Sequence, residues 1–196
     1  MTNVKFVAAV LLLCASALPA VAAEPFHANG EWRQYNRDWL AACPDKVNED
    51  AAGYYGTSCF ASTGSAEKNS ASLPAYSMTI VVNRLTGVTD LALTVAADDV
   101  SVDFGRPLVV AFGGEAPISF DMNKDMETRD NVSNQFFVAD PARSTALLDK
   151  LRLRNAVKLT VPITGMTPNK QVTLSLRGVA ASLDFMDVYA RKLAQY

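Results

Sequence analysis

Hydrophobic and polar residues alternate through the segment 76–122, and this alternation is the strongest structural signal in the chain. Near its start, Tyr76, Met78 and Ile80 are separated by the hydroxyl side chains of Ser77 and Thr79. A period of two is typical of strands that turn one face to a core and the other to solvent. The segments with this pattern, each expected to form a strand, are 76–84, 91–96, 100–104, 108–112, 118–122, 157–161 and 172–176.

Glycine-containing turn signals separate the first strands at intervals of roughly ten residues, which favours short antiparallel connections. Examples are Thr86-Gly87 and Gly113-Gly114. The sequence therefore predicts an all-β protein, an antiparallel β-sandwich that is immunoglobulin-like or jelly-roll-like. The segment 61–75, rich in Ser, Ala and Asn, is expected to be a mobile surface loop.

Two helices are expected to interrupt the strands, one near 141–153 and one near 179–194. At the first, Asp140 can cap the helix and Pro141 suits the first helical position. The second is expected to cover a sheet edge or an end of the sandwich with one apolar face, and partner binding is the alternative for that face. Its apolar residues repeat at four- and three-residue spacing: Val179, Leu183, Met186, Ala190 and Leu193.

The N-terminal residues 1–23 have the features of a secretory signal peptide. Lys5 precedes an uncharged apolar run, and small residues follow that run at the expected cleavage site. The run is too short for a transmembrane anchor, which needs about 20 apolar residues. Cys14 falls inside the apolar run, so it is expected to leave with the signal. Residues 24–196 are then expected to form a single domain.

Two cysteines remain in that domain, Cys43 and Cys59. An even number of cysteines in an exported chain predicts a disulfide bond between them. A pair of reactive thiols is the alternative. It is disfavoured because the two cysteines lack CxxC spacing and have no cationic cluster nearby in the sequence.

Composition excludes several functional classes. The chain has 18 basic and 20 acidic side chains, and this balance argues against a general binder of nucleic acid or of anionic membranes. His27 is the single histidine, so no two-histidine metal site is possible. It lies close to the expected new N-terminus and is expected to be solvated. No cofactor-binding, nucleophile-elbow or zinc motif is present, and neither a catalytic residue nor a metal site is predicted.

Carboxylates are the remaining candidates for catalysis. A glycosidase-like pair could be drawn from Asp98, Asp99, Asp103 and Asp121, although alternating strands place such residues toward water in any soluble sandwich. The segment 121–125 spaces oxygen ligands as a calcium loop does. It lacks the glycine and the bidentate glutamate of an EF-hand, so a polar hairpin loop is the preferred interpretation.

Trp32, Tyr35 and Trp39 form an aromatic-rich start to the domain and are the candidate binding residues. Such side chains can stack on a carbohydrate or anchor a protein interface. For Trp39 the preferred interpretation is a core residue near the disulfide bond. An open aromatic-lined cleft would support ligand binding, and burial of the indoles would argue against it.

Four motifs follow one another along residues 31–190: Asp38-Trp39-Leu40-Ala41-Ala42-Cys43, Cys59-Phe60, Gly105-Arg106-Pro107-Leu108 and Leu174-Ser175-Leu176-Arg177-Gly178-Val179-Ala180-Ala181. With these motifs in this order, the chain resembles the invasion-associated locus B family of exported bacterial proteins. The resemblance implies a periplasmic or surface-associated β-sandwich, linked in pathogens to host-cell invasion, and it supplies no catalytic residues. Two features depart from the family pattern: 136–139 holds no second cysteine pair, and Val179 replaces an aromatic residue.

The sequence therefore predicts a non-enzymatic protein of the periplasm or cell surface that binds an envelope or host protein, without a cofactor or a transmembrane anchor. The first alternative is a module that binds a small molecule or a glycan. The second is a carboxylate-based hydrolase.

Overall fold

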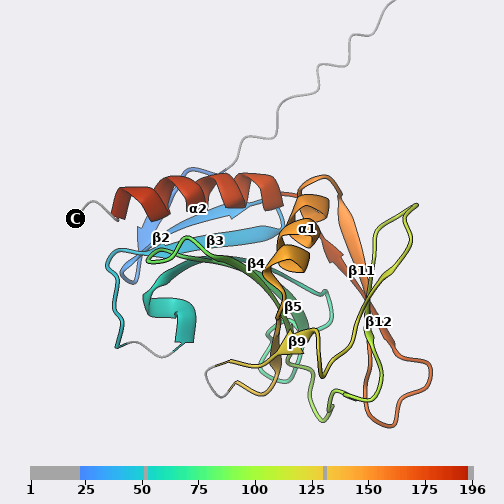
Figure 1. Cartoon of the computed structure of the whole chain (residues 1–196). Helices are drawn as coiled ribbons and strands as arrows, with labels where there is room; N and C mark the ends of the chain where they lie inside the picture. The colour runs from blue at the N-terminus through green and yellow to red at the C-terminus, as the bar shows by residue number, and fades with distance from the viewer. Residues whose placement is uncertain (1–22, 51–52, 130–131, 194–196) are drawn as a thin grey trace, which may run out of the picture.

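The structure, a computed structural model, describes residues 23–50, 53–129 and 132–193. Residues 1–22 of the expected signal peptide, which include Cys14, lie outside the described residues. Two antiparallel sheets and two α-helices make up the fold (Figure 1). This arrangement confirms the prediction of an all-β sandwich with short helices.

The larger sheet has eight strands in the order β1-β2-β3-β4-β5-β6-β10-β9. Strands β1 to β6 pair in sequence order, so this part of the sheet is a simple meander. The strands are β1 (Phe26–Ala28), β2 (Glu31–Asn36), β3 (Trp39–Pro44), β4 (Ser58–Gly64), β5 (Tyr76–Asn83), β6 (Thr89–Val95), β9 (Met126–Glu127) and β10 (Gln135–Val138).

The smaller sheet has four strands in the order β12-β11-β7-β8. All four were predicted from alternation, as were β5 and β6 in the larger sheet. The strands are β7 (Leu108–Ala111), β8 (Ile118–Phe120), β11 (Ala156–Val161) and β12 (Lys170–Ser175).

The strand predicted at 100–104 is wrong. Only an isolated bridge between Val102 and Ile163 forms there, and Phe104 is 44% exposed. The reason is a turn at Asp103, whose carboxylate accepts the backbone N–H of Gly105 at 2.9 Å and the Arg106 Nε–H at 2.7 Å. A carboxylate that satisfies local donors competes with strand pairing.

The loop predicted at 61–75 begins later than expected, because β4 continues to Gly64. Ala61 has no exposed surface and Thr63 is 5% exposed, so this part of the segment belongs to the sheet. Small side chains fill these positions, and they gave no hydrophobic signal even though they are buried.

One face of the larger sheet, called here the inner face, is covered by both helices and by the smaller sheet. Helix α2 (Val179–Leu193) lies across β2, β3 and β4, and α1 (Pro141–Arg152) packs beside β6 near the junction of the two sheets (Figure 1). The opposite face is called the outer face. On that side lies η1 (Gly53–Gly56), where Tyr55 contacts the ring of Phe60.

Both helix predictions are confirmed. The Asp140 side chain accepts the backbone N–H of Ala142 at 2.8 Å and so caps α1 as predicted. The apolar face of α2 is buried, with Val179 2%, Leu183 6% and Met186 0% exposed. This face covers the inner face of the sheet rather than an edge or an end. Neither helix in the described part of the chain is long and apolar enough to cross a membrane.

Candidate functional site

The outer face carries a row of side chains that runs across six strands. Directly paired residues of antiparallel neighbours share a face, so the ladder registers define the row. Its members are large and apolar at both ends and small or hydroxylated in the middle. In order they are Tyr35, Leu40, Ser62, Thr79, Ala92 and Phe137.

The Phe137 end of the row is closed. Phe137 is 2% exposed and packs with Val81 and Ala92, and the Arg129 guanidinium lies 4.5 Å over its ring. Arg129 is itself held by Asp90 at 2.8 Å. A cation stacked on an aromatic ring covers apolar surface at little cost, so this end offers no docking surface.

The Tyr35 end is open and forms a groove, called here the outer-face groove, of about 480 Å³. Tyr35 is 52% exposed and Leu73, across the groove, is 58% exposed. The ring of Phe26 stacks on Tyr35 with 5.9 Å between centroids and extends the apolar surface. Hydroxyl groups of Ser62, Ser77 and Thr94 also line the groove.

Trp39 has no exposed surface, and its indole Nε1–H donates to the backbone carbonyl of Ser175 at 3.0 Å. An enclosed indole offers no ring face to a ligand. The structure therefore places Trp39 in the core, which is the interpretation preferred from sequence.

Trp32 and Tyr35 lie on opposite faces of β2. Trp32 is half-buried on the inner face, where its ring packs against the rings of Tyr189 of α2 and of His27. The distances between ring centroids are 5.6 Å to Tyr189 and 5.4 Å to His27. His27 is exposed, and its Nε2 lies 2.5 Å from the Asp45 carboxylate. Of the three aromatic candidates, only Tyr35 presents its ring at an open surface, so they do not form one cleft.

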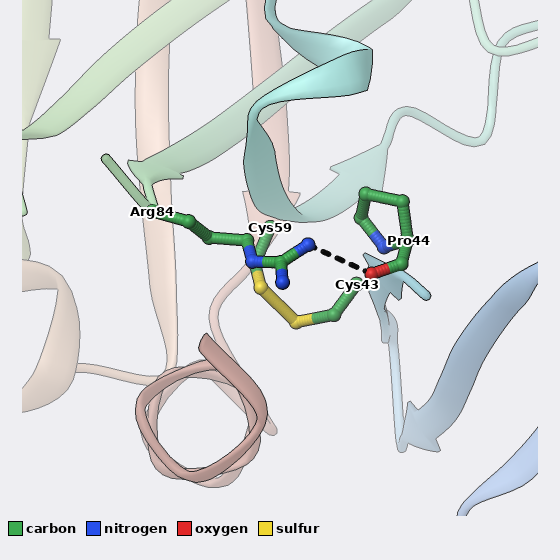
Figure 2. The surroundings of a disulfide bond; sticks show 4 residues. All are labelled: Cys43, Pro44, Cys59 and Arg84. Atoms are coloured by element: carbon green, nitrogen blue, oxygen red, sulfur yellow. Dashed lines mark hydrogen bonds between the residues drawn. A yellow bond between two sulfur atoms is a disulfide. The ribbon is translucent and has the colours of Figure 1, made fainter. Parts of the chain in front are cut away.

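The predicted disulfide bond between Cys43 and Cys59 is confirmed, and neither residue has exposed surface. Arg84, at the end of β5, lies beside the bond and donates from Nη1 to the carbonyl of Pro44 at 2.9 Å (Figure 2). Its Nε and Nη2 atoms are buried and have no hydrogen-bond partner among the residues that the structure describes, and burial lowers the pKa of this guanidinium. The bond thus links the end of β3 to the start of β4 beside a partly buried cation.

Replacing both cysteines, Cys43→Ala with Cys59→Ala, is expected to reduce stability substantially. The bond closes a loop with a sequence separation of 16. Removing a disulfide bond that closes a loop of this length lowers the unfolding free energy by about 3 kcal/mol. Thermal unfolding should shift down by about 6–12 °C. The wild-type chain measured with dithiothreitol is the control and should shift similarly; an unchanged midpoint in the double variant would contradict the expectation.

Three of the four candidate catalytic carboxylates, those of Asp98, Asp103 and Asp121, accept hydrogen bonds from the protein itself. Donation from Arg106 and from the Gly105 N–H holds the pKa of Asp103 below its ordinary value, whereas a general acid needs a raised pKa. Asp98 accepts two hydrogen bonds from Ser70, and the exposed Asp121 accepts the N–H of Asn123 at 2.9 Å.

The segment 121–125 is a polar turn next to a cation. One carboxylate oxygen of Asp125 pairs with Arg143 at 2.7 Å, and the other accepts the Asp121 N–H at 2.8 Å. Arg143 is the main reason that the pKa of Asp125 is lowered. Across residues 23–50, 53–129 and 132–193, no group of three or more His, Cys, Asp or Glu side chains is placed to hold a metal ion.

A second cleft, of about 650 Å³, lies between α1, α2 and the β5–β6 turn. Its lining mixes both signs of charge, with Arg84, Asp149 and Asp184 among the lining residues. Sequence reasoning missed this cleft because its residues come from three segments that only the tertiary fold brings together.

Comparisons of this chain with protein-family models, with curated proteins and with solved structures find no match.

Proposed function

We propose that this chain is an exported envelope protein without enzymatic activity, which acts by binding another protein through the outer-face groove. The observation that carries the proposal is the exposed apolar surface of Phe26, Tyr35 and Leu73 at one open end of a rigid sheet. Tyrosine is among the residue types enriched at the energetically important positions of protein interfaces, and a contiguous exposed apolar patch marks such an interface.

Two further features support export to the cell envelope. A disulfide bond persists in oxidising compartments, such as the periplasm or the cell surface, and is rare in the cytosol. The motifs described above are also similar to those of invasion-associated locus B proteins, which are exported. We propose membership of that family on the motifs alone.

Glycan or small-molecule binding is the second candidate function, and the lining of the same groove favours it. Ser62, Ser77 and Thr94 place hydroxyl groups beside the exposed ring of Tyr35. A ring face with adjacent hydroxyls suits a sugar, which presents both C–H and O–H groups.

Site-specific photo-crosslinking in intact cells tests the proposal. A photoreactive phenylalanine analogue at position 35 is expected to give one reproducible protein adduct, because Tyr35 lines the groove and is 52% exposed. The same analogue at position 158, where Lys158 is exposed on the smaller sheet, should not give that adduct. Absence of any adduct at position 35 under several growth conditions would overturn the proposal.

Charged substitutions then locate the interface. Leu73→Asp is expected to lower the adduct yield at least about tenfold, because it puts a carboxylate into an apolar contact. Val188→Asp is the matched control, because Val188 is 48% exposed on α2 and lies away from the groove. If position 35 gives no protein adduct but the NMR resonances of Tyr35 shift when envelope oligosaccharides are added, the second candidate function, glycan binding, is established instead.

A further inference from the structure

Four arginines from three segments of the chain line one surface pocket, called here the arginine pocket, of about 310 Å³ at the start of α2. Arg37 comes from the β2–β3 turn and Arg177 precedes α2. Of the other two, Arg152 is the last residue of α1 and Arg154 lies two residues beyond it. The residues that line this pocket include no carboxylate, although the whole chain carries a net charge of −2. The four residues are Arg37, Arg152, Arg154 and Arg177.

Two of these cations are balanced by neighbours and two are not. The Arg154 side chain donates to Glu115 at 3.0 Å, and the Arg177 side chain donates to Asp38 at 2.9 Å. Arg37 and Arg152 are exposed and make no ion pair within the part of the chain that the structure describes. The pocket therefore has an excess of positive charge at its surface.

The first turn of α2 adds backbone donors to the same pocket. Val179 N–H bonds to the Leu176 carbonyl at 3.2 Å, and the next N–H group with a backbone partner is that of Ser182, bonded to Gly178 at 3.0 Å. No described side chain accepts from the N–H groups of Ala180 or Ala181, and the first turn has no acidic residue. By contrast, α1 has the Asp140 carboxylate at its start. Helix α2 thus presents two free donors and the positive end of its dipole.

Asn36 shows independently that polar groups at this pocket are not satisfied by the protein alone. It lines the pocket and is 2% exposed, and its side-chain Nδ2 donates to Ser182 Oγ at 3.1 Å. Its Oδ1 is buried with no hydrogen-bond partner in the described structure. A buried polar atom without a partner costs about 1–3 kcal/mol, so a bound polar group at the pocket would be favoured.

We propose that the arginine pocket binds a phosphate group, either as free phosphate or as a phosphate monoester. Guanidinium groups bind phosphate oxygens through paired N–H bonds, and the start of a helix supplies further N–H donors. A phosphate group that keeps a proton, whether free or as a monoester, also carries an O–H donor for Asn36 Oδ1, which a carboxylate or a sulfate lacks. The inference goes beyond the proposed function, because it concerns a small anionic ligand and a second pocket, which shares only Arg37 with the outer-face groove.

Titration of the full chain by NMR at constant ionic strength tests the proposal. Inorganic phosphate is expected to shift the amide resonances of Ala180 and Ala181 with saturation, whereas sodium chloride should leave them in place. Glycerol phosphate forms the second arm: tighter binding than inorganic phosphate identifies a monoester as the ligand, and weaker binding identifies the free ion. Absence of saturable shifts with both phosphates would overturn the proposal, as would sulfate binding equal to that of phosphate.

Variants separate binding at the pocket from general charge effects. Arg37→Ala with Arg152→Ala is expected to weaken phosphate binding at least about tenfold without loss of the fold, because both side chains are exposed and unpaired. Arg191→Ala, which removes an exposed arginine from the other end of α2, is the matched control. Ala180→Asp places a carboxylate in the first turn and should compete with phosphate. If phosphate binding were unchanged in both pocket variants, phosphate would not bind at the arginine pocket. This result does not depend on whether the outer-face groove binds a protein partner.

Discussion

Gly178→Ala is expected to lower the unfolding free energy by about 4 kcal/mol, a large loss for a single methyl group. Gly178 has a φ angle of +103°, which alanine rarely adopts, and a Cβ atom there would lie 1.7 Å from the backbone oxygen of Asn36. The backbone conformation costs about 1–3 kcal/mol, and overpacking costs about 1–3 kcal/mol more. The glycine allows the β2–β3 turn to contact the start of α2.

Denaturant unfolding of the variant measures this loss directly, and Gly165→Ala separates its two causes. Gly165 also has a positive φ angle, +74°, but a Cβ atom there would meet nothing within 4 Å. The control should therefore lose only the conformational part, about 1–3 kcal/mol. If the two variants lost equal stability, the close approach of Gly178 to Asn36 would not exist in solution.

The sequence predicted strands wherever large apolar residues alternate with polar ones, as at Met78 and Ile80. It did not predict β2, whose Trp32 and Tyr35 lie on opposite faces among charged and polar residues, or β3, where small residues such as Ala41 occupy buried positions. These positions are small because α2 and Trp39 fill the space above the sheet, and that is a property of the tertiary fold. Only packing, not alternation, distinguishes such strands from loops.

Prediction of the candidate sites was limited for the same reason. Tyr35 was identified as a candidate from its residue type, and it does lie at an open groove. Its separation from Trp32 and Trp39 follows from strand register, which the sequence alone did not give. The arginine pocket combines residues more than a hundred positions apart, such as Arg37 and Arg177, and no local pattern brings them together. The disulfide bond was predictable because the expected mature domain contains two cysteines, which leaves one possible pairing within the domain.

Trp39→Ala is expected to cost about 3–5 kcal/mol of unfolding free energy and to lower the melting midpoint by about 6–20 °C. The side chain has no exposed surface and packs within the main hydrophobic core on the inner face of the sheet. Its removal leaves a cavity and also leaves the Ser175 carbonyl, now bonded to the indole at 3.0 Å, without its donor. Circular dichroism follows the unfolding without depending on tryptophan fluorescence.

Two further variants divide this cost between packing and hydrogen bonding. Trp39→Phe keeps most of the apolar volume and removes the indole donor, so we expect it to lose about 1–3 kcal/mol. Trp32→Ala removes the same type of side chain from a half-buried position on β2. The loss of unfolding free energy should be smaller than for Trp39→Ala, because folding buries less of the apolar surface of Trp32. A loss at Trp32 equal to that at Trp39 would mean that Trp39 is not enclosed, and would restore it as a residue able to stack on a ligand.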